Sequence, residues 1–130
     1  MALMKFREGN RVKWIGSKPG HDGTQVFTSF PATNATAIVY TVPVGSVLYL
    51  VESFLGVTAI AAGYVVLQIQ NAGGAFVRHL CFIQVGAAAP VHDSHFTAWP
   101  PVELPAGFTI RVQSSAVGLT AYGAIFGWVE

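Results

Sequence analysis

The chain has 130 residues, of which 52% are hydrophobic and only 10% are charged, and its formal net charge is +1. This length fits one domain with its own core, and the charged fraction is far below the roughly 25% of a typical soluble domain. A single cysteine, Cys81, excludes an intrachain disulfide. The surplus of apolar residues predicts that other subunits cover part of the surface, so we expect an oligomer.

Neither a membrane span nor a secretion signal is expected. Residues 54–67 are uncharged and mostly apolar, but this stretch is shorter than the roughly 20 residues of a spanning helix and contains Gly56 and Gly63. Residues 1–18 carry scattered charges and no apolar run, unlike a signal peptide. The sequence therefore predicts no membrane partner and no secretion by a signal peptide.

The N-terminal segment differs from the rest in charge. Its first 18 residues hold five cations and one acid, Glu8, for a net charge of +4, whereas the remainder has a net charge of −3. It is rich in glycine and keeps no period of 2 or 3.6, which predicts an extended arm with one short strand near residues 11–15. The basic part ends near residue 24, and we place the domain boundary so that residues 1–30 are arm and residues 31–130 are body.

Cations and an aromatic ring are interleaved along this arm, and we expect them to bind a partner. An acidic or polar protein surface is the favoured partner, and packing on the arm's own oligomer is the alternative. Nucleic acid is not expected, because five cations are few and the body has no basic stripe. The predicted contact residues are Lys5, Arg7, Arg11, Lys13, Trp14 and Lys18.

From residue 25 onward, short stretches rich in β-branched and aromatic residues alternate with turns rich in glycine, proline and asparagine. No stretch has the period of an amphipathic helix. The sequence predicts eight strands, at residues 25–30, 35–42, 46–54, 64–71, 76–85, 95–99, 108–114 and 120–129.

Most of these strands alternate between apolar and polar residues, as expected for one buried face and one wet face. The strands at residues 46–54 and 120–129 are apolar on both faces and need cover on both sides. In a one-domain sandwich, a second subunit is the simplest cover. The predicted oligomer interface is therefore Val47, Tyr49, Val51, Tyr122, Phe126 and Trp128.

Two similar turns precede long strands. Val42-Pro43-Val44-Gly45 leads into the third predicted strand, and Leu104-Pro105-Ala106-Gly107 leads into the seventh. Proline fixes φ and glycine accepts a positive φ, so the proline and glycine of each segment form a tight turn that leads into the strand. Two similar units among eight strands predict two Greek keys folded together, that is, an eight-stranded antiparallel jelly-roll sandwich with an extended N-terminal arm.

With these turns and the terminal Gly127-Trp128-Val129-Glu130, residues 35–130 resemble the small jelly-roll virion proteins of tailed bacteriophages. These include head decoration (cement) proteins and tail or fibre knobs. The resemblance implies a homotrimer on the capsid surface, made in the host cytoplasm, in which an N-terminal arm or a sheet edge grips the major capsid protein or another virion protein. It implies no catalytic residues. The alternatives are a receptor-binding or tail-fibre knob and a free carbohydrate-binding jelly-roll module.

Residues 92–95, His-Asp-Ser-His, form the strongest candidate for metal chemistry, with His79 as a third ligand. On an extended strand, however, residues three apart point to opposite faces. No nucleophile elbow, phosphate loop or closely spaced carboxylate pair is present. We therefore expect no metal, no cofactor, no small-molecule ligand and no enzymatic activity.

Two further features have ordinary structural interpretations. Cys81 is expected to be a buried, inert thiol on the strand face shared with Val77, Ile83 and Val85. Trp99 and the other large aromatic residues could form a platform for sugars, but core and interface packing is the favoured role.

Overall fold

The computed structural model describes residues 4–8, 11–15, 24–33, 36–59, 61–86, 91–116 and 118–130. These residues contain ten strands and no helix, and therefore no helix able to cross a membrane. The strands are β1 (Met4–Glu8), β2 (Arg11–Ile15), β3 (Thr24–Thr33), β4 (Ala37–Thr41), β5 (Leu48–Ala59), β6 (Gly63–Gln70), β7 (Phe76–Val85), β8 (Val91–Leu104), β9 (Thr109–Ser114) and β10 (Leu119–Val129).

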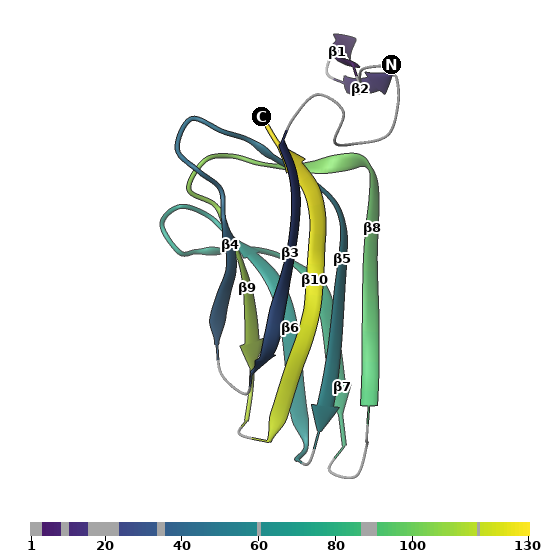
Figure 1. The fold of residues 1–130 in the computed structure, drawn as a ribbon, viewed down its shortest axis with the longest axis vertical. Helices are drawn as coiled ribbons and strands as arrows, with labels where there is room; N and C mark the ends of the chain where they lie inside the picture. The colour runs from purple at the N-terminus through teal and green to yellow at the C-terminus, as the bar shows by residue number, and fades with distance from the viewer. Residues whose placement is uncertain are drawn as a thin grey trace.

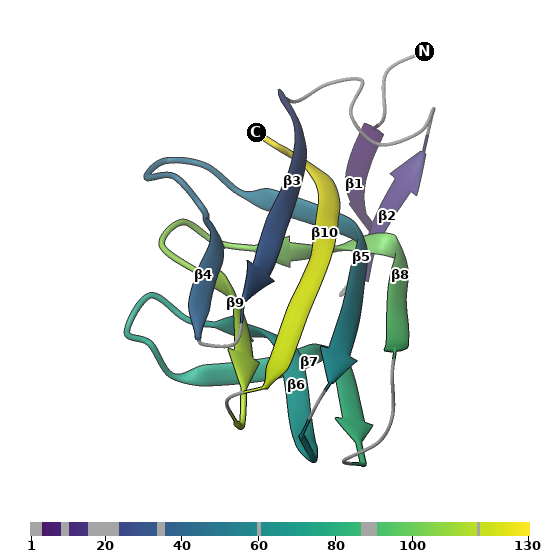
Figure 2. The same cartoon turned by 60° about the horizontal axis from the view of Figure 1, so that its bottom comes forward.

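Eight of these strands form two four-stranded antiparallel sheets, in the orders β3-β10-β5-β8 and β4-β9-β6-β7. The two sheets lie one in front of the other, with the four strands of the first sheet nearer the viewer in Figure 1 and again in Figure 2. We call them the front sheet and the back sheet. The predicted all-β antiparallel sandwich is confirmed.

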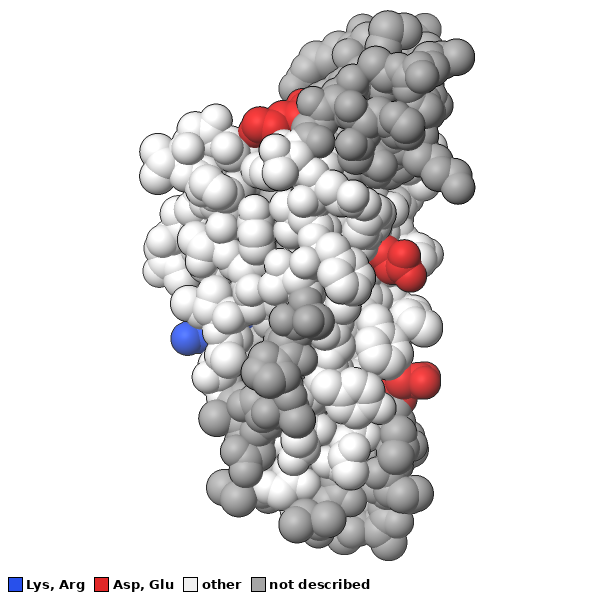
Figure 3. Space-filling view, viewed as in Figure 1, with Lys and Arg blue, Asp and Glu red and all other residues white. Residues whose placement is uncertain are grey.

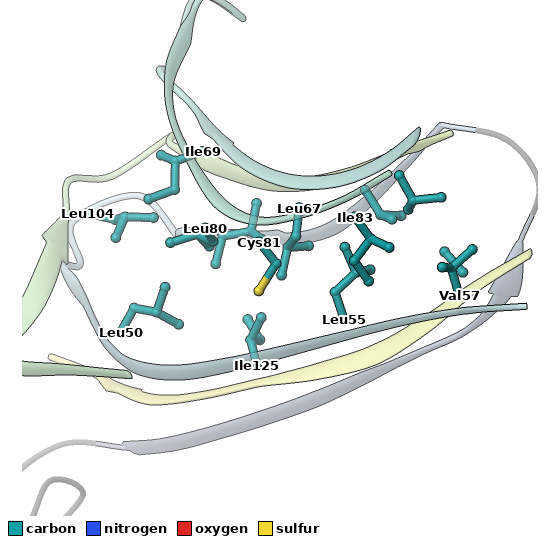
Figure 4. Close-up of a cluster of buried hydrophobic side chains, with 14 of the residues drawn as sticks. Leu50, Leu55, Val57, Leu67, Ile69, Leu80, Cys81, Ile83, Leu104 and Ile125 are labelled. Carbon is teal, nitrogen blue, oxygen red and sulfur yellow. The ribbon is translucent and has the colours of Figure 1, made fainter. Parts of the chain in front are cut away.

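The core lies between the two sheets. Leu50, Leu55 and Ile125 of the front sheet point toward Leu67 and Ile69 of the back sheet, and Figure 4 shows these side chains meeting in one layer. All five are almost completely shielded from solvent. At roughly 1.5 to 3 kcal/mol for each fully buried aliphatic side chain, this layer is the main source of the stability of the fold.

The two repeated turns of the sequence lie together at one end of the sandwich. Gly45 and Gly107 have φ angles of 79° and 82°, which only glycine adopts without strain. The Gly107 amide donates to the Val42 carbonyl, and the Val42 amide donates to the Phe108 carbonyl, both at 2.9 Å. The internal repeat therefore corresponds to two equivalent turns that are hydrogen-bonded to each other.

β5 runs to Ala59 instead of ending at residue 54, because Gly56 is a strand residue and not a turn residue. The ring of Tyr122 on β10 lies over Gly56, its cross-strand neighbour, in the space that a Cβ atom would fill. Glycine inside a strand often marks such a close approach.

Two prolines that directly follow predicted strands lie within observed strands instead. Pro31 is part of β3, an edge strand, where a missing amide hydrogen is tolerated. β8 continues to Leu104, but its pairing with β5 passes directly from Thr97 to Val102, so Pro100 lies in a bulge. The peptide bond before Pro100 is cis.

A bulge also divides the face predicted for β7. The register between β6 and β7 shifts at Leu80, so Cys81 and Ile83 point into the core while Val77 is exposed. The prediction that Val77 shares the buried face of Cys81 was therefore wrong, because strict alternation does not continue through a bulge.

The N-terminal segment contains a second strand that was not expected. β1 pairs with β2 in a separate two-stranded antiparallel sheet, with Phe6 opposite Lys13. The predicted strand at residues 11–15 is present, but it is paired with residues 4–8 rather than extended singly. β3 begins at Thr24 and pairs with β10, so residues 24–30, assigned to the arm in the expected division, lie in the front sheet.

Candidate partner-binding surfaces

Charge is divided between the two sheets of the sandwich. The front sheet holds three acids and no lysine or arginine, whereas the back sheet holds Arg78 and Arg111 and no acid. The three acids, Glu52, Asp93 and Glu103, are exposed on the two adjacent strands β5 and β8. The front sheet therefore presents a negative outer face and the back sheet carries the positive charge of the body.

A hollow of about 450 Å³ lies on the outer face of the front sheet. One row across the strands places Phe27 of β3 beside Phe126 of β10, and Phe126 beside Glu52 of β5. The next row pairs Ala124 with Phe54. The methyl group of Ala124 is small, so the hollow has a low floor between these taller side chains; the residues lining it are Phe27, Glu52, Phe54, Ala124, Ile125 and Phe126.

Of the phenylalanines that line the hollow, one is highly exposed and another is held in place by neighbouring rings. Phe27 is 70% exposed, although it is a large apolar side chain. Phe54 is half-buried, with its ring centroid 4.8 Å from that of His95 and 6.0 Å from that of Tyr122. Figure 3, which looks onto this sheet, shows mostly uncharged surface with acidic residues toward its margins. Three phenyl rings and one carboxylate thus meet in an otherwise uncharged area.

Four of the six predicted interface residues belong to one cluster on the outer side of β5 and β10. Tyr49 and Trp128 stack with ring centroids 5.1 Å apart and planes at 25°, and Val47 and Val51 pack against them. Tyr49 is 5% exposed and Trp128 is fully buried within a single chain. The structure thus separates this cluster from the other two residues, which are both half-buried: Phe126 lines the hollow, and the ring of Tyr122 lies beside that of Phe54.

The predicted arm contacts lie mainly on the β1–β2 hairpin. Lys5 and Arg7 belong to β1, and Arg11, Lys13 and Trp14 belong to β2. In the backbone register Lys5 is opposite Trp14. Lys18 lies outside the described residues. The structure therefore brings four of the five cations onto two paired strands.

The back sheet carries a column of aromatic rings along β7, which is its edge strand. The ring centroid of Phe82 lies 5.7 Å from that of Tyr64 of β6, and the two rings are stacked with their planes at 20°. His79 continues the column, at 6.0 Å from Phe82 and 4.8 Å from Phe76. All four rings are exposed, and they form a strip along β6 and β7 of the back sheet.

Amide and guanidinium groups border this aromatic strip. Gln68 is the cross-strand partner of both His79 and Arg111, and its Nε2 lies 3.5 Å from Oε1 of Gln113. Arg111 donates from an Nη atom to Oε1 of Gln70 at 3.3 Å. The Nε atom of Arg111 is buried and has no hydrogen-bond partner among the described residues. The back face therefore combines flat rings with fixed donors and acceptors.

The histidines proposed as metal ligands lie on different sheets. His79 is on β7 of the back sheet, whereas His95 is on β8 of the front sheet beside Phe54. Within the described residues, no three histidine, cysteine, aspartate or glutamate side chains come close enough to hold a metal ion.

Cys81 is buried, as predicted. Its Sγ atom lies 3.6 Å from Oγ of Ser53 and 3.7 Å from the carbonyl oxygen of Ser94. Burial raises the pKa of the Cys81 thiol, and the hydrogen bond with Ser53 opposes part of that rise. The thiol is thus kept protonated, the form that does not act as a nucleophile.

The residues of the hollow were only partly foreseen. Phe126 was predicted as an interface residue, but Phe27, Glu52 and Phe54 were not. Phe27 and Phe54 are far apart in the sequence and meet only because β3 and β5 flank β10. The available signal was the phenylalanine at residue 27, which alternates with Val26 and so points away from the core.

Comparisons with known proteins give no family for this chain. No protein-family model matches the sequence, and no curated protein matches it. Among solved structures, a chain from the structure of infectious bursal disease virus, Gt strain, aligns with 95% of this chain at 10% sequence identity and a TM-score of 0.36. The aligned part makes up 36% of that longer chain. The classification of this chain therefore remains at the level of an antiparallel β-sandwich.

Proposed function

We propose that the sandwich is a jelly roll, built from two Greek keys. The strand orders β3-β10-β5-β8 and β4-β9-β6-β7 support this, because each sheet interleaves strands from the first and second halves of the chain. The paired turns at Gly45 and Gly107 also support it, since each turn follows a strand of the back sheet or leads into one. Such a fold provides rigid faces and no helix.

On this fold we propose a non-enzymatic virion structural role. The protein would act as an oligomer, a homotrimer, that decorates or cements a bacteriophage capsid by binding neighbouring subunits, including the major capsid protein. Its mechanism is burial of apolar area across several subunits at once, which stabilises the shell by mass action and avidity. The basic N-terminal segment would bind a neighbouring subunit.

The observation that carries this proposal is the outer face of the front sheet. It exposes aromatic rings and acids, has no cation, and faces away from the core. Exposed aromatic side chains beside a hollow often mark an interaction site, so a protein partner best explains this face. The low charge of the whole chain agrees with this view.

The test is assembly with a shell. The full chain would be coexpressed with the major capsid protein of the virus that encodes it, and shells would be sedimented and analysed for bound protein. The proposal expects co-sedimentation at a fixed stoichiometry and a trimeric mass for the free protein by light scattering. Shells that sediment without the chain would contradict the decoration role.

A second function, a receptor-binding knob or a carbohydrate-binding module, is favoured by the back sheet. The exposed rings of Tyr64 and Phe82 stack on each other, and an exposed ring face of this pair could pack against the apolar face of a sugar ring, with Gln68 and Arg111 in the same sheet. This proposal predicts binding on a glycan array that is lost in Tyr64→Ala and Phe82→Ala. The matched control is Phe27→Ala on the opposite sheet, which should leave glycan binding unchanged.

A further inference from the structure

The hollow on the front sheet has the composition of a site for a cationic side chain. The faces of phenyl rings carry partial negative charge and attract ammonium and guanidinium groups, most strongly where water is partly excluded. Phe27, Phe54 and Phe126 supply such rings, and Glu52 supplies a full negative charge at the same place. A carboxylate among aromatic rings favours lysine or arginine over any neutral or acidic side chain.

The hollow is also held open before any ligand arrives. Phe54 is fixed between His95 and Tyr122, and Tyr122 is itself seated over Gly56. Ala124 at the floor leaves room that a larger side chain would fill. A ligand would therefore cause little reordering of the front sheet, which limits the entropy cost of binding.

The chain itself contains a segment with the complementary chemistry. Residues 1–18 have a net charge of +4 and interleave five cations with Phe6 and Trp14. The front sheet has three acids and no cation, so the two carry opposite charge. In contrast, the strands of the back sheet hold no acid, and Arg111 on β9 would repel the same segment.

We propose that the hollow lined by Phe27, Glu52, Phe54 and Phe126 receives a lysine or arginine side chain from the N-terminal segment of a second copy of this chain. The inference rests on the proposed function, in which the basic segment binds a neighbouring subunit, and it identifies that subunit as a second copy of this chain. Each copy then donates its segment to one neighbour and accepts another segment in its hollow. Such a head-to-tail contact closes into a ring when the rotation between copies permits, as a trimer requires.

Zero-length coupling of carboxylates to amines tests the contact directly. Equal amounts of unlabelled and ¹⁵N-labelled full chain would be unfolded together in urea and refolded, so that their subunits mix, and then coupled with a carbodiimide and digested. The variant Arg7→Lys/Arg11→Lys would be used alongside the wild type, so that every cation of the segment can react. The expected product joins the Glu52 peptide to a peptide from residues 1–18 and contains one labelled and one unlabelled partner.

Two results of this coupling would overturn the proposal. Products in which both peptides always carry the same label would mean that the segment occupies the hollow of its own chain. The absence of any product between Glu52 and residues 1–18 in both proteins would mean that the hollow does not receive the segment. Asp93, an exposed acid on the same sheet but outside the hollow, measures the background coupling.

Self-association of the full chain gives a second, independent measurement. Sedimentation velocity over a range of protein concentrations should show association about tenfold weaker for Glu52→Gln, the size expected for loss of one partly buried charged contact. Ala124→Leu should weaken association as well, because it fills the hollow. The matched controls are Asp93→Asn for the charge and Thr58→Leu for added bulk at an exposed position of β5.

Unchanged association of both hollow variants would contradict the inference. This outcome is separate from failure of the proposed function, which is measured by binding to shells. A protein that joins shells but whose Glu52→Gln variant self-associates like the wild type would retain the virion role and lose the assigned hollow. A protein that self-associates through the hollow but never joins shells would retain the assigned hollow and lose the virion role.

Discussion

The ring of Tyr122 on β10 lies directly over Gly56 on β5, in the space where any other residue would place its Cβ atom. This contact links the two central strands of the front sheet and also supports Phe54 at the edge of the hollow.

Gly56→Ala should destabilise the protein by about 1 to 3 kcal/mol, because the added methyl group overlaps the Tyr122 ring and forces one of the two strands to shift. Urea unfolding measured by tryptophan fluorescence gives the free energy of unfolding. The control is Gly86→Ala, at a position where a Cβ atom meets nothing within 4 Å and φ is not positive. Equal stability of the two variants would contradict the packing described for Tyr122.

The two repeated turns should respond differently to the same substitution. Gly45→Ala should cost about 1 kcal/mol, because φ is positive but the surroundings are open. Gly107→Ala should cost more, since its Cβ would also lie 3.0 Å from that of Ala72. Thermal unfolding of the two variants compares them, and a smaller loss for Gly107→Ala than for Gly45→Ala would be inconsistent with this geometry.

The bulge in β7 predicts unequal roles for two residues that strict alternation would treat alike. Ile83→Ala should lower the free energy of unfolding by about 2 to 5 kcal/mol, because Ile83 is buried in the core. Val77→Ala should change it by at most about 0.5 kcal/mol, because Val77 is exposed. Chemical denaturation of both variants measures this difference, and comparable losses would argue against the observed register.

Stability should fall in alkaline solution in a way that depends on Cys81. Burial raises the pKa of its thiol above the ordinary value of 9.0, so the folded state holds its proton more tightly than the unfolded chain. The associated stabilisation is complete below about pH 9 and is lost as the pH rises through the folded-state pKa. Burial also raises the pKa of Tyr40 from 10.0, which adds a loss at higher pH.

Cys81→Ala should therefore show a shallower decline in the free energy of unfolding as the pH rises above 9, whatever its stability at pH 7. Urea titrations at several pH values measure this slope. Tyr40→Phe serves as a comparison, because it should leave the earlier part of the decline and reduce only the later part. An unchanged slope in Cys81→Ala would show that the thiol does not contribute.

Much of the sandwich could be predicted from the sequence, because alternation and turn residues act locally. All eight strands predicted from residue 25 onward overlap observed strands, and both Pro-x-Gly turns were located correctly. The errors fall where a residue's role is set by a distant partner. Gly56 has the character of a turn until Tyr122 is placed over it, and Pro31 ends a strand only if that strand is not at an edge.

The candidate site was less predictable for the same reason. Phe126 could be predicted as an interface residue because its strand is apolar on both faces. Nothing in the sequence around Glu52 marks it as a binding residue. Its position beside Phe126, with Phe27 on the other side of that ring, depends on the order in which β3, β10 and β5 pair. A single sequence gives the composition of each strand, whereas the hollow depends on which strands are adjacent.

The separation of charge between the two sheets also affects how the molecule is oriented as it approaches a binding partner. Charge is unevenly distributed across the thin direction of the body, from the front sheet with Glu52, Asp93 and Glu103 toward Arg111 on the back sheet. In an external field such a body rotates as it diffuses, and it approaches a charged surface with one sheet leading. At physiological salt this orienting effect extends only about 8 Å, so it acts in the last step of an encounter.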